Sequence, residues 1–135
     1  MIKAVYDTNI LISGLLWKGL PYKCLLLAKA EVVELFLCDE IIAELSSKLK
    51  NKFNFTDIEV KTTIREIKSF SKNIKIEGNL KFVKEDRDDD KFIECAYNSN
   101  ADYIVSGDKH LLDLKSYKGI EILNVRDFLI TIREI

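Results

Sequence analysis

The sequence predicts an α/β fold, a three-layer α/β/α sandwich around a central parallel sheet of about five strands. Short apolar runs alternate with segments of helical periodicity along the whole chain. The 135 residues contain no low-complexity stretch, internal repeat or Gly/Pro-rich linker, which suits a single domain over residues 1–135. Strands that alternate with helices pair in parallel through right-handed crossovers. Such sheets bind ligands beyond the carboxyl ends of their strands.

Five short apolar runs mark the expected strands. The first begins almost at the start of the chain, where no apolar core or cleavage site of a signal peptide is present. The third is the weakest, and it has a possible continuation near Phe82-Val83. The expected strands are Ile2–Tyr6, Val32–Cys38, Ile74–Ile76, Ala101–Ser106 and Ile120–Leu123.

Helices are expected between these strands. Pro21 suits the first turn of a helix that continues to about Lys29. The next helix presents Ile41, Ile42, Leu45 and Leu49 on one face, and the capping-box pattern Thr56–Glu59 opens another that runs to Ser71. The remaining helices are expected from the acidic run Asp86–Asp90 to about Asn98, over Asp108–Leu114, and after an Asn124 cap near the end.

Composition excludes several classes of chemistry. The single histidine, His110, excludes sites built on several histidines, and no GxSxG motif is present for a serine hydrolase. Cys24, Cys38 and Cys95 are odd in number and widely spaced, which indicates buried thiols in a reducing cytoplasm. No apolar run is long enough to cross a membrane. The net charge of −1 gives no global basic field, but a metal-dependent nuclease carries positive charge in its bound ion.

Four acids follow four successive strands of the predicted sheet. Asp7 ends the first strand, Glu44 lies about one turn into the helix after the second, Asp90 opens the helix after the third, and Asp108 follows the fourth. Parallel topology places these strand ends at one edge, so the four side chains are expected to meet. Each acid also has an ordinary explanation, because Asp90 and Asp108 suit helix caps and Glu44 suits a solvated helix face.

Clustered carboxylates need a positive partner, and ligands made only of oxygen favour Mg²⁺ or Mn²⁺ over Zn²⁺. The chemistry that fits is metal-assisted hydrolysis of a phosphodiester, with no side-chain nucleophile. Whether one or two ions bind stays open at this point. It also stays open whether Asp88 or Asp89 shares the role given to Asp90.

Three motifs resemble those of PIN domains, and the resemblance spans essentially the whole chain in the expected order. It is strongest to the branch of toxin–antitoxin toxins related to VapC. The motifs, together with their residues, are Asp7-Thr8-Asn9-Ile10-Leu11-Ile12-Ser13, Asp88-Asp89-Asp90-Lys91-Phe92-Ile93-Glu94-Cys95-Ala96, and Ala101-Asp102-Tyr103-Ile104-Val105-Ser106-Gly107-Asp108-Lys109-His110-Leu111-Leu112.

The resemblance implies a ribonuclease dependent on Mg²⁺ or Mn²⁺, with an antitoxin protein as partner and a homodimeric state. It implies that Asp7, Asp90 and Asp108 hold metal and that Glu44 orients water or binds a second ion. Asn9 and Ser106 would then position Asp7 and Asp108. His110 stands where relatives often have an acid, and it is expected to be a rim residue.

Basic and aromatic residues offer contacts to RNA. Lys91 and Lys109 each follow a site acid and are expected to reach phosphate. Lys48, Lys50 and Lys52 form a charged run that also suits the end of a helix. Trp17 has three open interpretations: base stacking, a dimer contact or core packing.

Three other functions fit less well. A haloacid-dehalogenase-type phosphohydrolase would use Asp7 as its nucleophile, but Asn9 replaces the acid expected two residues later. A receiver domain would need paired acids at the first strand and a lysine after the fifth strand, and this sequence supplies neither. The third alternative is a catalytically weak module that binds RNA or a protein.

Overall fold

One sheet organises the described part of the chain, with strand order β3-β2-β1-β4-β6-β5. The computed structural model describes residues 1–77 and 89–135. Every neighbouring pair is parallel except β5 and β6, which are antiparallel. The strands are β1 (Ile2–Tyr6), β2 (Val33–Leu37), β3 (Ser71–Asn73), β4 (Tyr103–Val105), β5 (Ser116–Tyr117) and β6 (Ile120–Leu123).

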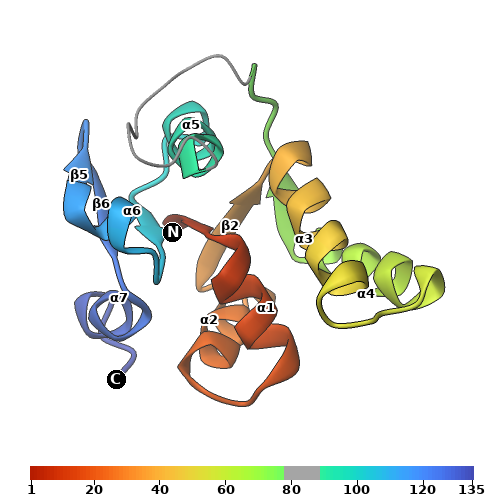
Figure 1. Ribbon diagram of the computed structural model, residues 1–135. Coiled ribbons are helices and arrows are strands. Elements are labelled where there is room, and N and C mark those ends of the chain that lie inside the picture. The colour runs from red at the N-terminus through yellow and green to blue at the C-terminus, as the bar shows by residue number, and fades with distance from the viewer. Residues whose placement is uncertain (78–88) are drawn as a thin grey trace.

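Helices cover both faces of this sheet, which confirms the predicted α/β sandwich. In Figure 1, α1, α2 and α7 lie on one face and α5 on the other, while α3 and α4 flank the β2–β3 side. The helices are α1 (Thr8–Leu16), α2 (Leu20–Lys29), α3 (Asp39–Asn51), α4 (Asp57–Ser69), α5 (Asp90–Ser99), α6 (Lys109–Leu114) and α7 (Val125–Thr131).

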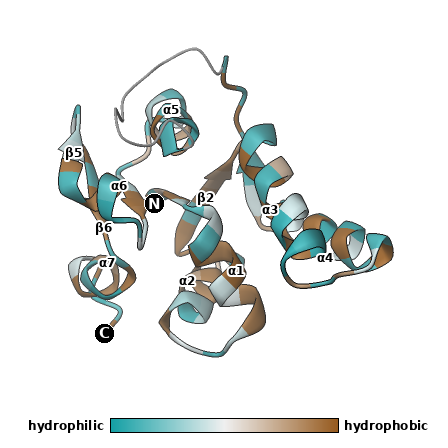
Figure 2. Cartoon of the chain, viewed as in Figure 1, coloured by the Kyte–Doolittle hydropathy of each residue, from teal (hydrophilic) through white to brown (hydrophobic). Residues whose placement is uncertain are grey.

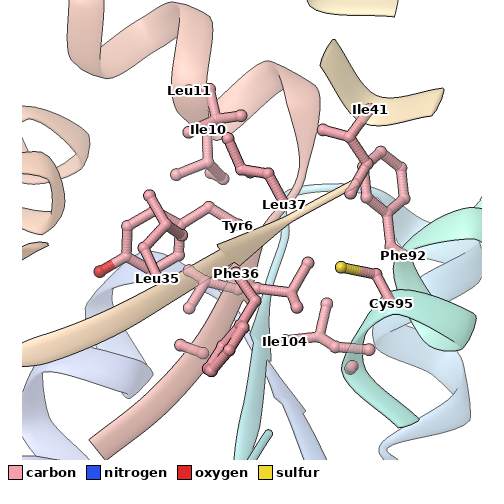
Figure 3. Packing of buried hydrophobic residues seen from close by; sticks show 14 of the residues in the cluster. Tyr6, Ile10, Leu11, Leu35, Phe36, Leu37, Ile41, Phe92, Cys95 and Ile104 are labelled. Atoms are coloured by element: carbon pink, nitrogen blue, oxygen red, sulfur yellow. The ribbon is translucent and has the colours of Figure 1, made fainter. Parts of the chain in front are cut away.

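The core lies on both faces of the central strands. Ala4, Val5 and Tyr6 of β1 are fully buried, as expected for a parallel strand covered on both sides. Figure 3 shows side chains from α1, the strands, α3 and α5 converging there. In Figure 2, hydrophilic and hydrophobic colours are mixed along α3, α4 and α5, as expected for helices with one apolar face. Cys24, Cys38 and Cys95 are buried and free, as predicted.

The topology reverses at β1, and this places the site. The chain moves from β1 to β2 and β3 on one side, then returns to β4 and β6 on the other. The carboxyl ends of β1 and β4 are adjacent, because Tyr6 pairs with Val105. Open α/β sheets bind ligands at such a reversal.

Helix α1 has no counterpart in the sequence prediction. The triplet Ile10-Leu11-Ile12 has no helical period of its own, but Asp7 caps the segment and starts a helix. Gly14 then allows close packing on α2, because a Cβ there would lie 2.8 Å from Leu25 Cγ and from Pro21 O.

The third strand also differs from prediction, whereas the last predicted strand, Ile120–Leu123, is confirmed as β6. β3 is Ser71–Asn73, just before the expected Ile74–Ile76, because its backbone pairs with β2 despite its polar side chains. Helix α4 accordingly ends at Ser69 rather than Ser71. The short strand β5 was not predicted. Phe82-Val83 and the acidic residues Asp86 to Asp88 lie outside the described residues.

Within residues 1–77 and 89–135, no single helix has the length and apolarity to span a membrane. The pair α1 and α2 passes that test together, but the two helices meet at a 95° bend.

Candidate functional site

Asp7 joins the end of β1 to the start of α1. Its backbone N–H donates to Val105 O at 3.0 Å, which continues the β1–β4 ladder by one residue. Its Oδ1 accepts from Ile10 N at 2.8 Å and caps the helix. The residue is only 3% exposed. Strand, helix and burial therefore fix the position of this carboxylate.

Ser106 links Asp7 to Asp108 beyond the end of β4. Its hydroxyl donates to Asp7 Oδ2 at 2.5 Å and accepts from Asp108 N at 2.9 Å. Gly107 N approaches the same Asp7 oxygen at 3.4 Å. Ser106 is fully buried. The structure thus brings together three of the residues selected from the sequence, two acids and the serine between them.

Asp108 is also a helix cap. Its Oδ1 accepts from His110 N at 2.8 Å and from Leu111 N at 3.3 Å, at the start of α6. The ordinary explanation of this acid as a cap is therefore present in the structure. It does not compete with a site role, because one carboxylate oxygen caps the helix while Ser106 ties the backbone to Asp7.

Burial raises the pKa of Asp7, and the negative charge of Asp108 adds to that effect. Hydrogen bonds from Ser106, Ile10 and Gly107 act in the opposite direction and stabilise the charged form. The increase prevails, which means that the fold holds this carboxylate at an energetic cost. A nearby cation would relieve both causes of the increase.

Glu44 lies at the same edge of the sheet, in the middle of α3. Thr8, the residue after Asp7, donates its hydroxyl to Glu44 Oε1. Lys91 Nζ lies 3.5 Å from that oxygen, and Lys48 Nζ lies 4.0 Å from Oε2. Lys91 follows Asp90 in α5, so Glu44 connects α1, α3 and α5 at this edge.

Asp90 is buried, at 6% exposure, as the first residue of α5. The N-cap position belongs to Asp89, whose side chain makes no capping hydrogen bond. Both acids have interactions beyond the contacts described here. Asp88 lies outside the described residues, so the choice among the three acids stays open.

Divalent metal fits this edge in donor chemistry. Asp7, Asp90, Asp108 and Glu44 offer carboxylate oxygens without histidine or cysteine, which suits Mg²⁺ or Mn²⁺. The energetic cost at Asp7 also favours a positive partner. Within residues 1–77 and 89–135, however, no three acidic, histidine or cysteine side chains are grouped closely enough to hold an ion.

The other selected residues lie around this group. Asn9 Oδ1 accepts from Lys48 Nζ at 3.3 Å, so its described partner belongs to α3 and is not Asp7. Lys109 is exposed and pairs with Asp113 at 3.4 Å. His110 is exposed, consistent with a rim position. Lys91 is largely covered, with its side chain 15% exposed.

Two contributors were missed by sequence reasoning. Thr8 holds Glu44, and Lys48 bridges Asn9 and Glu44. The available signal was the N-cap role of Asp7, because a helix that starts at Thr8 turns the side chains of Thr8 and Asn9 toward α3.

Comparison with known proteins identifies the family and the fold of this chain. The PIN domain family profile matches residues 3–110. The uncharacterised protein MJ1680 of Methanocaldococcus jannaschii is 36% identical over 132 residues, covering 92% of this chain and 83% of its own length. The crystal structure of VapBC2 from Rickettsia felis, bound to a DNA fragment from their promoter, matches with a TM-score of 0.62. That match is 16% identical and covers 91% of this chain and 98% of the other. The family profile, which matches most of the chain, establishes that this chain belongs to the PIN-domain family, whose members are typically nucleases.

Proposed function

We propose that this protein is an endoribonuclease dependent on Mg²⁺ or Mn²⁺ and that it acts as the toxin of a toxin–antitoxin pair. One observation carries the proposal: the buried Asp7 carboxylate is tied through Ser106 to Asp108 where the sheet topology reverses. Burial and a neighbouring acid both raise the pKa of Asp7, and a structural cap would not need that cost.

The site residues have different proposed roles, which follow from where each one lies. Asp7 and Asp108, with Asp90 from the neighbouring helix, would hold the ion, which supplies Lewis acidity toward a phosphodiester oxygen. Ser106 keeps the two strand-end acids together. Glu44, held by Thr8 and by the ammonium groups of Lys48 and Lys91, would orient the attacking water.

Basic side chains would position the substrate. Lys91 lies at the acidic edge, and Lys109 is fully accessible beside Asp108. Both suit contacts with phosphate oxygens, which fix the register of a bound strand without reading its sequence. Lysine contacts at the acidic edge reconcile RNA binding with the net charge of −1.

The proposed partners follow from the resemblance and from the structural neighbour. VapBC2 of Rickettsia felis is described as a complex bound to promoter DNA, and this supports a protein antitoxin as partner here. A homodimer and a cytoplasmic location belong to the same proposal. Family membership argues against the haloacid-dehalogenase and receiver alternatives.

The test is cleavage of a labelled single-stranded RNA by purified protein with Mn²⁺. Cutting should require Mn²⁺ or Mg²⁺ and stop when EDTA is added. Asp7→Asn should abolish it, because the variant loses the buried carboxylate charge. Asp113→Asn is the matched control, since Asp113 is an exposed acid on α6 that pairs only with Lys109 among described groups.

Metal binding can be measured independently by thermal melting. Millimolar Mn²⁺ should raise the melting temperature of the wild-type protein but not of Asp7→Asn, because an ion bound only by the folded state stabilises it. Cleavage retained by Asp7→Asn would refute the site. An absence of both cleavage and a metal-dependent shift would favour the binding-module alternative.

A further inference from the structure

An aromatic pair, the exposed Trp17 and the half-buried Phe53, lies at the far end of α1 and α3. Trp17 follows α1 and is 60% exposed, which excludes the core-packing interpretation of this residue. Its ring meets Phe53, just after α3, edge to face at a centroid distance of 6.4 Å. Trp17 N donates to Ser13 O at 3.1 Å, so the backbone that carries the ring is held by the helix end.

A line of contacts connects this pair to the acidic edge. Thr8 bonds Glu44 at the start of α1, Asn9 bonds Lys48 next, and Trp17 meets Phe53 at the end. The two helices therefore run alongside each other in the same direction, as Figure 1 shows. Nine helical steps separate Thr8 from Trp17, or about 14 Å. An extended strand of a few nucleotides can cover that length.

The side of α3 that carries Glu44, which is half-buried, supplies positive charge along this line. Lys48 and Lys52 follow Glu44 at intervals of four residues, so they share one side of the helix. The Lys52 ammonium lies 5.8 Å from the centre of the Phe53 ring. Among the described residues, no carboxylate forms an ion pair with Lys52, whereas Lys50 pairs with Asp57 at 3.0 Å on the other side.

We propose that Trp17, Phe53, Lys48 and Lys52 form a binding track for single-stranded RNA that leads to the acidic edge. The bases stack on the aromatic pair, and the lysines contact phosphates. Aromatic side chains beside lysines suit a single strand, because its unpaired bases expose ring faces that can stack on them. A duplex hides those faces. This inference rests on the proposed ribonuclease function and names where its substrate lies.

The experiment uses the only tryptophan of the chain as its reporter. Wild-type protein in EDTA is titrated with a short single-stranded RNA while Trp17 emission is followed. Saturable quenching is expected. The same strand in a duplex, and inorganic polyphosphate as a purely anionic probe, should leave the emission nearly unchanged.

Affinity of variants is then measured by the anisotropy of a labelled strand. Trp17→Leu should weaken binding about ten-fold, which corresponds to losing one base–aromatic stack. Trp17→Phe should restore most of the affinity, and Lys52→Gln should weaken binding and its salt dependence. The matched control is Lys118→Gln. Lys118 also lies over aromatic rings, at 5.4 Å from Tyr97 and 5.6 Å from Tyr117, but in the turn before β6 at the opposite edge.

The outcomes separate this track from the proposed function. Mn²⁺-dependent cleavage without quenching, or equal affinity in Trp17→Leu and wild type, would overturn the track and leave the nuclease intact. Quenching by duplex or polyphosphate as strong as by the single strand would also overturn it. If RNA quenches Trp17 emission in EDTA but the protein never cleaves RNA, the binding track is supported and the ribonuclease function is refuted.

Discussion

Removing the Ser106 hydroxyl should damage both stability and activity. The hydroxyl is fully buried and makes two bonds, donating to Asp7 Oδ2 and accepting from Asp108 N. Ser106→Ala removes one oxygen and leaves two polar groups to be satisfied in another way. Because the bond to the Asp7 carboxylate is charge-assisted, its loss is the larger of the two.

The magnitude follows from these two bonds. A hydrogen bond to a charged group contributes about 1.5–3 kcal/mol, and a neutral one about 1 kcal/mol. Water reaching the site would recover part of this, so the expected loss in the free energy of unfolding is about 2–4 kcal/mol. For a domain of this length that corresponds to a fall in melting temperature of roughly 10 °C. Positioning partners of metal ligands also contribute about 10–100-fold in activity, and cleavage should fall accordingly.

Urea unfolding at neutral pH measures this loss in the free energy of unfolding. Ser99→Ala is the matched control, because Ser99 is also buried and, among the described residues, its hydroxyl makes one hydrogen bond, donated to Ala96 O at 3.2 Å. That carbonyl already accepts from Ala101 N at 2.9 Å, so the control should lose under about 1 kcal/mol.

A double-mutant cycle isolates the contact with Asp7. In an Asp7→Asn background the Ser106→Ala loss should shrink by roughly half, since the charge-assisted bond is already gone. A Ser106→Ala loss no larger than that of Ser99→Ala would refute the reasoning. A loss unchanged by Asp7→Asn would show that the serine acts without the carboxylate.

Two further predictions concern charge and packing. Burial raises the pKa of Asp7 above its unfolded value of 3.8, so the folded protein holds this proton more tightly than the unfolded chain. In the metal-free wild-type protein, the contribution of Asp7 to the free energy of unfolding is therefore lost as the pH rises from about 4 through the raised pKa. Asp7→Asn should remove that loss, which thermal melts in EDTA across this range would detect; a wild type that gains stability relative to the variant over the same range would contradict the assignment. Leu45→Ala should cost about 2–5 kcal/mol in urea unfolding, because Leu45 is fully buried in the helix that carries Glu44. Ile58→Ala, at a residue 77% exposed, should cost almost nothing, and a similar loss in both would refute the packing argument.

The main errors of sequence reasoning share a physical cause. Helix α1 was missed because Ile10-Leu11-Ile12 shows no amphipathic period, since this helix is apolar on most sides. Its existence depends on the Asp7 cap and on packing of Gly14 against α2. The third strand was predicted at Ile74–Ile76 instead of Ser71–Asn73, because these polar residues form a strand by pairing with β2. An edge pairing has no strong local signal, and the cap signal of Asp7 is not followed by the amphipathic period that would mark a helix.

The amino-acid sequence was enough to predict the α/β class, the buried strand β1 and the acids that follow successive strands. These features are local, because apolar runs and helical periods record which side of each element faces the core. The three-dimensional arrangement was needed to show that Ser106 joins Asp7 to Asp108, that Glu44 lies between Thr8 and two lysines, and that Trp17 meets Phe53. Those contacts join residues up to 99 positions apart, and they arise where sheet order and helix packing bring separate elements together.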